Sequence, residues 1–380
     1  MIPGIPTISH AGLPAWVTPE ELDRRTAHGD HFPLVDHDIC VFAFRGEVVS
    51  VRLEHFGTGL PHDLHYRRLG HSDWWVLPLR MPAETRLEYK VETISSYGTR
   101  LGDDPLNPHG AEHPFGANSV CTASGYHQPG WSERRDGVER GRIVEYYDHS
   151  EALGRRATAG IYLPNGFELH RDHRYPLLVM LDGDDYVNYA GAQTVLDNLI
   201  ADRQIPPMVV AFSRPGQRLT EYADDPRHHR YLVDELVPAL ERDLPVGGTP
   251  ALRCLMGCSF GGVATLSAAV YAPGYFGRLL LQSGSFAGAG EGCWERPERL
   301  WWPVKDFVAR YLQHPTWVTE RMVVTCGAFE SLICENRGML EVLRRTGMDV
   351  RMVIQLDGHN WVCWRDSLGL ALPWLFPHAG

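Results

Sequence analysis

Residues 255–262, Leu-Met-Gly-Cys-Ser-Phe-Gly-Gly, constrain the fold of this chain more than any other segment. An apolar strand-like run leads into Gly-x-Ser-x-Gly, and a small-residue helix begins directly after it. A strand–turn–helix of this kind forces Ser259 into a strained backbone conformation, and glycine two residues to either side lets the neighbouring chain pass closely. We therefore interpret Ser259 as a nucleophile. An ordinary turn serine is the alternative, because 38 of the 380 residues are glycine and the motif also arises by chance.

From residue 142 onward, strand-like and helix-like segments alternate. This alternation predicts an α/β fold with a mostly parallel sheet covered by helices on both faces. Strands are expected at 142–147, 159–163, 177–181, 208–212, 253–256, 279–282, 322–326 and 350–355. Helices are expected at 189–201, 229–240, 262–271, 302–313, 336–346 and 363–375.

The N-terminal third has a different pattern. After a short helix at 19–27, apolar and polar residues alternate in short runs separated by turn residues, which is typical of a small immunoglobulin-like β-sandwich. These runs are 38–44, 48–54, 74–79 and 86–92. Residues 95–140 are rich in Gly, Pro, Asn and His and are interpreted as a linker with fixed turns. The predicted domains are a β-sandwich at 1–125, a linker at 126–140 and an α/β catalytic domain at 141–380.

Composition excludes several classes of function. The net charge of −11 disfavours a nucleic-acid partner. No apolar run approaches the roughly 20 residues of a membrane helix, and the N-terminus lacks the pattern of a signal peptide. The eight cysteines form no Cys-x-x-Cys pair and no zinc-ligand spacing, which favours buried reduced thiols. We expect a cytoplasmic protein without a bound metal or cofactor and without a membrane partner.

Two residues downstream of Ser259 could complete a catalytic triad in the order serine, acid, histidine. His359 follows the last predicted strand, and Glu330 follows the strand before it, so both are expected at the edge of the sheet that holds Ser259. His359 would take the serine proton, and Glu330 would orient the imidazole. Glu335 and Asp357 are rival candidates for the acid.

An ester hydrolase also needs hydrogen-bond donors for the oxyanion. One candidate is the backbone N–H of Phe260, directly after the serine. The other is the backbone N–H of Asp184, after the strand 177–181, where Gly183 allows a turn. The alternative for this loop is an acidic turn or a cation site, although the spacing of a calcium loop is absent.

Taken together, these residues resemble the esterase D superfamily and, within it, the ferric enterochelin (enterobactin) esterases. The resemblance covers nearly the whole chain. The stretches that carry it are Asp104-Pro105-Leu106-Asn107-Pro108, Leu181-Asp182-Gly183, Arg218-Leu219-Thr220-Glu221-Tyr222, Glu235-Leu236-Val237-Pro238, Gly257 to Gly262, Gln282-Ser283-Gly284-Ser285, Gly327 to Glu330 with Asn336-Arg337, and Gly358-His359 with Trp364-Arg365. The chain departs from the family at Asp357-Gly358-His359-Asn360, where Gly-Gly-His-Asp is usual, and at Asp184 and Asp185, where an aromatic residue often stands.

This resemblance implies an α/β-hydrolase fold with Ser259 as nucleophile, Glu330 as acid and His359 as base, and with the amides of Asp184 and Phe260 forming the oxyanion hole. It also implies the substrate, a ferric catecholate trilactone siderophore. The enzyme would hydrolyse its esters through an acyl-enzyme in the cytoplasm and release the iron. No cofactor is implied, because the iron arrives with the substrate.

A ferric tris-catecholate is a bulky aromatic trianion, so its site needs arginines for charge and aromatic faces for the rings. The candidates are Arg214, Arg218, Trp294, Trp301 and Trp302. Packing between an insertion and the body of the domain is the alternative for the tryptophans, and a structural pair with Glu221 is the alternative for Arg218.

Two other functions are also compatible with the sequence. The chain could be a carbohydrate esterase of the feruloyl type with a sugar-binding N-terminal domain, although such enzymes usually carry a secretion signal. It could also be a non-catalytic binder of siderophores or glycans, which the complete Ser–Glu–His set disfavours.

Overall fold

The structure is a computed structural model that describes residues 4–55, 57–169, 172–290 and 298–377, with the backbone alone at 298–300. Its contacts divide the chain into two compact units. The first consists of Met1–His127 together with two short segments, Gly327–Ser331 and Leu356–Asn360. The second consists of Gln128–Cys326, Leu332–Gln355 and Trp361–Gly380. The predicted linker at 126–140 and the predicted domain limits stay predictions.

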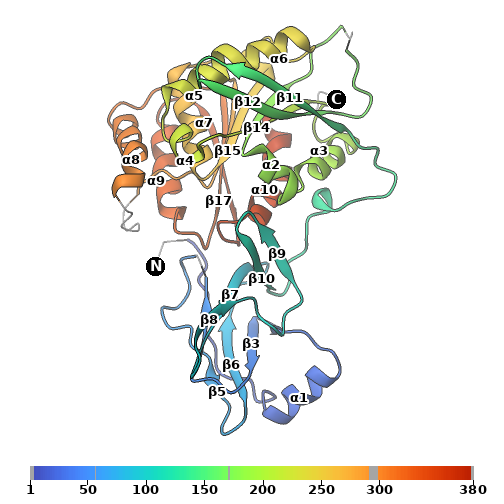
Figure 1. The fold of residues 1–380 in the computed structure, drawn as a ribbon, viewed down its shortest axis with the longest axis vertical. Helices are drawn as coiled ribbons and strands as arrows, with labels where there is room; N and C mark the ends of the chain where they lie inside the picture. The colour runs from blue at the N-terminus through green and yellow to red at the C-terminus, as the bar shows by residue number, and fades with distance from the viewer. Residues whose placement is uncertain (1–3, 56, 170–171, 291–297, 378–380) are drawn as a thin grey trace. The chain divides into compact units, whose positions relative to one another are not determined.

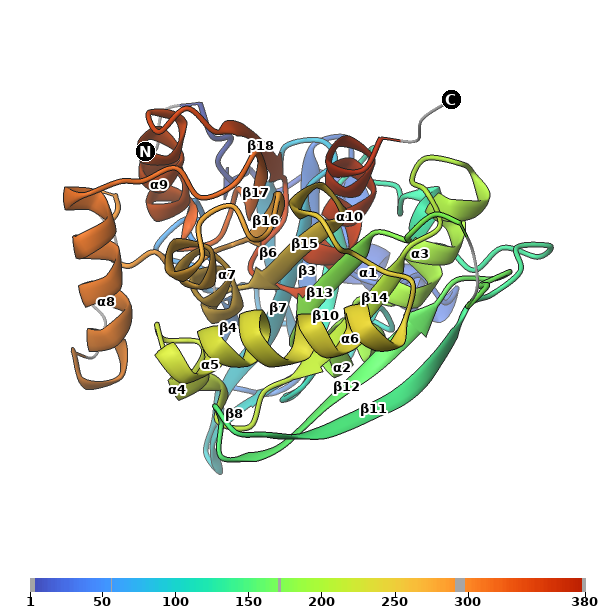
Figure 2. The same ribbon diagram turned by 90° about the horizontal axis from the view of Figure 1, so that it is seen from above.

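An eight-stranded sheet forms the centre of the second unit, in the order β11-β12-β14-β13-β15-β16-β17-β18 (Figures 1 and 2). The pairs β11–β12 and β12–β14 are antiparallel, and the ladder from β14 through β13, β15 and β16 to β17 is parallel. The expected α/β class with a mostly parallel sheet is therefore confirmed. The strands are β11 (Arg142–Ser150), β12 (Arg155–Leu163), β13 (Leu177–Leu181), β14 (Val209–Arg214), β15 (Arg253–Cys258), β16 (Arg278–Gln282), β17 (Arg321–Gly327) and β18 (Asp349–Gln355).

Helices cover this sheet on both faces because its central strands are apolar throughout (Figures 1 and 2). Successive side chains of a strand point to opposite faces. Accordingly, Leu177 and Val179 pack in one core with α6 to α9, whereas Leu178 and Met180 pack in another with α2, α3 and α10. The helices are α2 (Gly183–Asn188), α3 (Ala192–Ala201), α4 (Arg218–Glu221), α5 (Pro226–Arg230), α6 (Val237–Asp243), α7 (Phe260–Tyr271), α8 (Glu298–Gln313), α9 (Ile333–Arg344) and α10 (Trp361–Leu375), with a π-helical turn at Tyr231–Leu236.

The first unit contains two five-stranded sheets and one helix, α1 (Pro19–Ala27). One sheet holds β1 (Ser9–His10), β2 (Leu34–Asp36), β3 (Ile39–Arg45), β5 (Arg67–Arg68) and β6 (Trp74–Arg80). The other holds β4 (Ser50–Glu54), β7 (Arg86–Ser95), β8 (Gly98–Gly102), β9 (Gly110–His113) and β10 (Gly116–Thr122). Phe42 and Leu77 from the first sheet share a core with Val51 and Tyr89 from the second. The immunoglobulin-like class stays a prediction.

Three strands, β8, β9 and β10, lie between residues 98 and 122, so the interpretation of 95–140 as a linker was wrong over this stretch. The strand β8 pairs with β7, and β10 pairs with both β7 and β9. The first four residues of β8 are all exposed, and β10 buries the polar Asn118 and Ser119. These strands form through backbone hydrogen bonds to an existing sheet, and they lack the apolar alternation that marks a half-buried strand.

Two residues that follow β17 complete the core of the first unit. Ala328 and Phe329 are buried among side chains of β3, β4, β6 and β7. The Phe329 N–H donates to the Asp357 carbonyl at 3.0 Å, and its carbonyl accepts from the Thr58 N–H at 2.6 Å. The loops after β17 and β18 thus fold as part of a unit that begins more than 300 residues earlier.

No helix within the described ranges combines the length and apolar character that a membrane crossing requires. No disulfide joins the cysteines that the structure describes, and all but Cys334 of these are buried.

Two adjacent histidines on α5 are buried without charge. Burial lowers the pKa of His228 to about 4 and that of His229 also to about 4. The His229 Nε2 lies 2.9 Å from Ser267 Oγ, whereas His228 Nδ1 is buried without a hydrogen-bond partner. Both imidazoles are therefore held neutral at pH values at which an exposed histidine is already protonated.

We expect acid to destabilise the fold through these histidines. Their folded pKa lies below the unfolded value of about 6.5, so the unfolded chain binds more protons between pH 6.5 and pH 4. The stability they contribute is complete above pH 6.5 and is lost as the pH falls toward 4. Thermal unfolding across this window should show a flatter pH dependence for His228→Gln and His229→Gln than for wild type. Equal slopes in all three proteins would contradict the assignment.

Candidate active site

Ser259 occupies the turn between β15 and α7 with φ 57° and ψ −119°. A positive φ is strained for a residue other than glycine and costs about 1–3 kcal/mol. The close packing expected around the turn is present at Gly257, where a Cβ would lie 2.5 Å from the Gly261 carbonyl oxygen. At Gly261 a Cβ would meet ordinary contacts, the nearest at 3.5 Å from Asp182 Oδ2, so the approach requires glycine only at position 257.

Hydrogen bonds from the loop after β16 hold the Ser259 turn in place. The Ser259 N–H donates to the Gln282 carbonyl at 2.9 Å, and the Ser285 N–H donates to the Ser259 carbonyl at 3.0 Å. The Oγ of Ser259 lies 3.2 Å from Ser285 Oγ, and Ser259 itself is half-buried. The hydroxyl is therefore fixed in direction while part of the residue stays open to solvent.

Two helices begin next to the strand ends where oxyanion donors were expected. Phe260 is the first residue of α7, and Asp184 is the second residue of α2. The first amides of a helix have no partner within it, which makes them available to an anion. Asp182 precedes α2 with φ 56°, and its own N–H donates to the Tyr222 hydroxyl at 3.0 Å. The turn thus places the amides of Gly183 and Asp184 in the first turn of α2, where they have no partner within the helix.

Glu330 and His359 form a hydrogen-bonded pair. The His359 Nδ1 lies 2.5 Å from Glu330 Oε2, and the Gly327 N–H donates to Glu330 Oε1 at 2.5 Å. The Glu330 side chain is fully buried, whereas that of His359 is 29% exposed. A buried carboxylate on Nδ1 keeps the proton there and leaves Nε2 as the basic nitrogen, as a general base requires.

The two rival candidates for the acid, Asp357 and Glu335, have other surroundings. Asp357 is buried and accepts hydrogen bonds from Arg86, Gly358 and Asn360. Burial raises the pKa of Asp357 to about 6, and the Arg86 guanidinium opposes this rise. Glu335 is buried in the first turn of α9. Of the three candidates, Glu330 is the one found against His359.

Both arginines predicted to bind the substrate already hold carboxylates. Arg214 pairs with Asp184 and Glu145, at 2.6 Å to each. Arg218 donates to both Asp182 oxygens, at 2.8 and 2.7 Å. The alternative of a pair between Arg218 and Glu221 was wrong, because Glu221 accepts from Arg155 instead.

The pair with Arg218 also accounts for one of the acidic side chains of this turn. The Asp182 side chain is 1% exposed, and both its oxygens face Arg218. Burial works against the guanidinium charge, but Asp182 raises the pKa of Arg218 above its usual value. Among the residues that the structure describes, no three His, Cys, Asp or Glu side chains gather as metal ligands.

The three predicted tryptophans differ in their surroundings. Trp301 packs on the ring of Phe260 at a centroid distance of 4.8 Å, which places it beside the residue that follows Ser259. Trp302 is 64% exposed. Trp294 lies outside the described residues. An aromatic face is therefore present next to the Ser259 turn.

Sequence reasoning missed Ser285 as a neighbour of Ser259 and Arg86 as a partner of Asp357. Ser285 stands in Gln282-Ser283-Gly284-Ser285, a run noted only for the resemblance, although its position after a parallel strand places it at the same sheet edge. Arg86 opens a strand of the first unit, 271 positions from its partner Asp357. No local pattern connects two residues so far apart.

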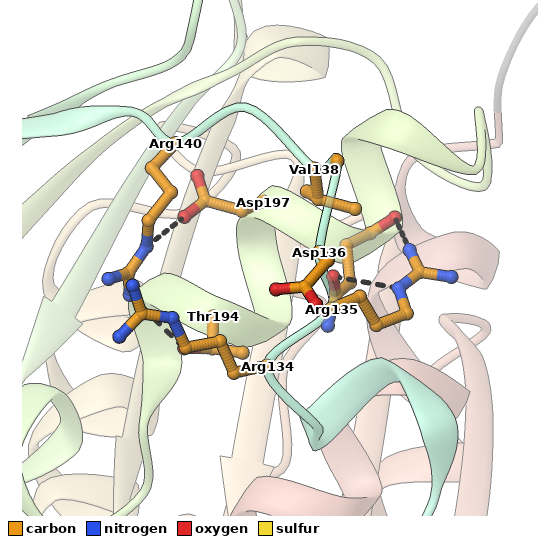
Figure 3. A pocket seen from close by; sticks show the side chains of 9 residues that line it. Arg134, Arg135, Asp136, Val138, Arg140, Thr194 and Asp197 are labelled. Atoms are coloured by element: carbon orange, nitrogen blue, oxygen red, sulfur yellow. Dashed lines mark hydrogen bonds and ion pairs between the residues drawn. The ribbon is translucent and has the colours of Figure 1, made fainter.

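A pocket of about 170 Å³ lies between residues 134–140 and α3 (Figure 3). Arg135 Nε donates to Asn198 Oδ1 at 3.0 Å, and Arg140 Nε lies 3.6 Å from Asp197 Oδ2. The Gly141 N–H donates to Asp197 Oδ1 at 2.9 Å. These contacts fasten the segment before β11 to the second unit, so we assign them a structural role.

Comparison with known proteins gives a family match and several relatives. A family model described as "Putative esterase" matches residues 150–375. The iron(III) enterobactin esterase of Dickeya dadantii is 29% identical over 53% of this chain and 47% of its own length. The iron(III) salmochelin esterase of Escherichia coli O6:H1 is 24% identical over 79% of this chain and 77% of its own. An endo-1,4-beta-xylanase/feruloyl esterase of Xylanibacter ruminicola is 28% identical over 72% of this chain and 37% of its own length. The chain thus spans less than half the length of two of these relatives.

Solved structures support the fold. The enterobactin esterase from Shigella flexneri, crystallised in the presence of enterobactin, superposes with a TM-score of 0.70 at 20% identity, over 96% of this chain and 99% of its own. A ferulic acid esterase superposes with a TM-score of 0.53 at 19% identity, over 62% of this chain and 97% of its own. The likeness to the first therefore extends through both compact units, and that to the second over less than two thirds of the chain.

The Arg218–Asp182 pair can be tested as a structural element. Arg218→Met should lower the free energy of unfolding by about 2 kcal/mol, because it leaves the buried Asp182 carboxylate without the donors that satisfy it. Arg227→Met is the matched control: it breaks an arginine–aspartate pair whose arginine is 53% exposed, and it should cost below about 1 kcal/mol. Urea unfolding measures both. Equal stability of the two variants, with weaker substrate binding in Arg218→Met, would instead favour the substrate role.

Proposed function

Since the chain belongs to the Esterase family, which makes it an ester hydrolase, we propose that it cleaves the ester bonds of a catecholate trilactone siderophore through a serine acyl-enzyme. The observation that carries the chemistry is the short Glu330–His359 pair, combined with a strained serine at the strand end of β15. The names of the enterobactin and salmochelin esterase relatives support the substrate class.

In the proposed mechanism, the Nε2 of His359 must reach the Ser259 hydroxyl in the reacting enzyme. His359 takes the proton as Oγ attacks the ester carbonyl carbon, and Glu330 stabilises the resulting imidazolium. The ester carbonyl oxygen becomes an oxyanion that accepts hydrogen bonds from the backbone amides of Phe260 and Asp184. His359 then returns the proton to the departing alkoxide oxygen, which leaves as an alcohol and opens the lactone ring.

The second half of the reaction repeats these roles with water. His359 removes a proton from water as its oxygen attacks the acyl carbon on Ser259. The bond to Oγ breaks, Oγ regains the proton from His359, and a carboxylic acid is released. Each turnover thus consumes one water and breaks one ester. Three turnovers convert a trilactone into separate catecholate units, which hold iron less tightly because the chelating groups are no longer linked.

The surroundings of Ser259 favour an aromatic substrate. Trp301 packs against Phe260, and Trp302 exposes a large aromatic face on the same helix. Stacking of a catechol ring on such a face would supply binding energy outside the reacting bond. Arg214 and Arg218 are already engaged by carboxylates, so we do not expect them to bind the anionic substrate as free cations. We place the reaction in the cytoplasm, consistent with the absence of disulfides among the described cysteines.

Product analysis tests the substrate. We expect the wild type to convert a ferric catecholate trilactone into linear trimer, dimer and monomer, seen by mass spectrometry. Ser259→Ala removes the nucleophile and should form none of these products, while Ser285→Ala keeps the nucleophile and should retain measurable turnover. Activity of the wild type on a feruloylated sugar but not on the trilactone would favour the feruloyl esterase function, which the relative from Xylanibacter ruminicola supports.

The role of Glu330 can be tested separately. Glu330→Gln keeps the shape of the side chain but removes its charge, so kcat should fall by about 10³- to 10⁴-fold because the imidazolium is no longer stabilised. Glu335→Gln, which changes another buried glutamate of the same region, should alter kcat less than tenfold. Steady-state kinetics on a small activated ester measures both, and a larger loss in Glu335→Gln would transfer the acid role to that residue.

A further inference from the structure

The loops that carry Glu330 and His359 are anchored to strands of the first unit by two separate sets of contacts. The first set comes from the turn after β4. Gly57 forms an isolated antiparallel bridge with Glu330, and the Thr58 N–H donates to the Phe329 carbonyl at 2.6 Å. The Thr58 Oγ1 also donates to the Glu330 carbonyl at 3.1 Å. The backbone on both sides of the Glu330 Cα is thereby fixed.

This first contact is a close approach of two backbones. A Cβ at Gly57 would lie 2.3 Å from the Phe329 carbonyl oxygen, far inside any normal contact. Only glycine lets the turn come near enough to pair with the loop. Phe329 is in turn locked in the core of the first unit, so the loop has little freedom to move away.

The second set comes from Arg86, the first residue of β7. Its side chain is 4% exposed, and one terminal nitrogen donates to Asp357 Oδ2 at 3.1 Å and to Asn360 Oδ1 at 3.3 Å. The Asn360 Nδ2 donates to Asp357 Oδ1 at 2.7 Å, and the Arg86 N–H donates to the Leu356 carbonyl at 2.9 Å. His359 is therefore bracketed in the sequence by residues that Arg86 holds.

The charges around Arg86 explain why a guanidinium is needed here. It lies between two carboxylates, Asp357 and Glu88, the second at 2.9 Å from its other terminal nitrogen. A planar guanidinium can serve several acceptors at once in fixed directions, which a lysine ammonium on a flexible stem does not reproduce. Without it, Asp357 would be a buried carboxylate lacking its positive partner, and its loop would have to open toward water.

We propose that Arg86 and the Gly57–Thr58 turn are positioning elements through which the first unit sets the geometry of the Glu330–His359 pair. They touch neither the substrate nor the reacting atoms and act through the two loops. This role rests on the proposed function. It makes the first unit a structural part of the acid–base machinery, whatever it contributes to substrate binding.

Steady-state kinetics on a small activated ester, with the full chain, tests the proposal. Arg86→Leu should lower kcat about 100-fold with KM within threefold of wild type, because misplacement of a catalytic group by about 1 Å costs about that factor. The kcat of Arg86→Lys should lie between that of wild type and that of Arg86→Leu. The matched control is Arg253→Leu, which breaks an arginine–glutamate pair with both side chains 14% exposed at the start of β15. It should keep kcat within threefold of wild type.

A second variant should displace the loop that carries Glu330 without removing a charge. Gly57→Ala should lower kcat by a similar factor, whereas Gly12→Ala, where a Cβ would meet nothing within 4 Å, should have no effect. Proton NMR supplies a readout independent of turnover. The hydrogen in the 2.5 Å contact between His359 and Glu330 should give a far-downfield resonance that Glu330→Gln abolishes. We expect Arg86→Leu and Gly57→Ala to lose or shift it, and Arg253→Leu to keep it.

The outcomes separate the two proposals. If Ser259→Ala stays fully active, the proposed function is wrong. If Ser259→Ala is inactive while folded Arg86→Leu and Gly57→Ala keep the kcat and the downfield resonance of wild type, the function stands and the positioning role is overturned. A rise in KM at unchanged kcat in both variants would also overturn it, because it would move their effect from the acid–base pair to binding.

Discussion

The positive φ of Ser259 is the constraint on which the arrangement of the second unit depends. A φ of 57° persists only when the surroundings leave no alternative. Here Gly257 brings the end of β15 against the backbone of Gly261, and the loop after β16 clamps the turn from the other side. The strained turn is therefore held by the parallel sheet on one side and by the first turn of α7 on the other. Together these two elements form a rigid support for a nucleophile.

Beside this turn, an ion pair with a buried carboxylate and a half-buried guanidinium connects a third strand end to the same region. The Asp182–Arg218 pair joins the start of α2 to α4, and Arg218 also reaches the Cys258 carbonyl at 3.4 Å. The positive charge of Arg218 is therefore neutralised within the protein by Asp182. An enzyme acting on a trianion would then draw affinity from aromatic contact, for which Trp301 and Trp302 offer faces, more than from direct arginine salt bridges.

Much of the fold and part of the candidate site follow from local sequence patterns. Apolar runs separated by helical periodicity predict the strands of the parallel sheet, and the order of motifs predicts Glu330 and His359 as a pair. The rest depends on contacts between distant residues. The partner of Arg218 is 36 positions away and that of Arg86 is 271 positions away, so neither has a local signature. The strands β8 to β10 escaped prediction because backbone pairing, and not apolar alternation, defines them.

The inclusion of Phe329 in the core of the first unit has a consequence for how the chain folds as it is synthesised. Residues 1–127 leave the ribosome long before the loops after β17 and β18 exist. During that interval the nascent unit has an unfilled place among Phe42, Tyr89 and their neighbours, and the buried guanidinium of Arg86 has no aspartate. Completion of the N-terminal unit is thus deferred until residues 327–331 and 356–360 have been synthesised, although the rest of that unit is made first.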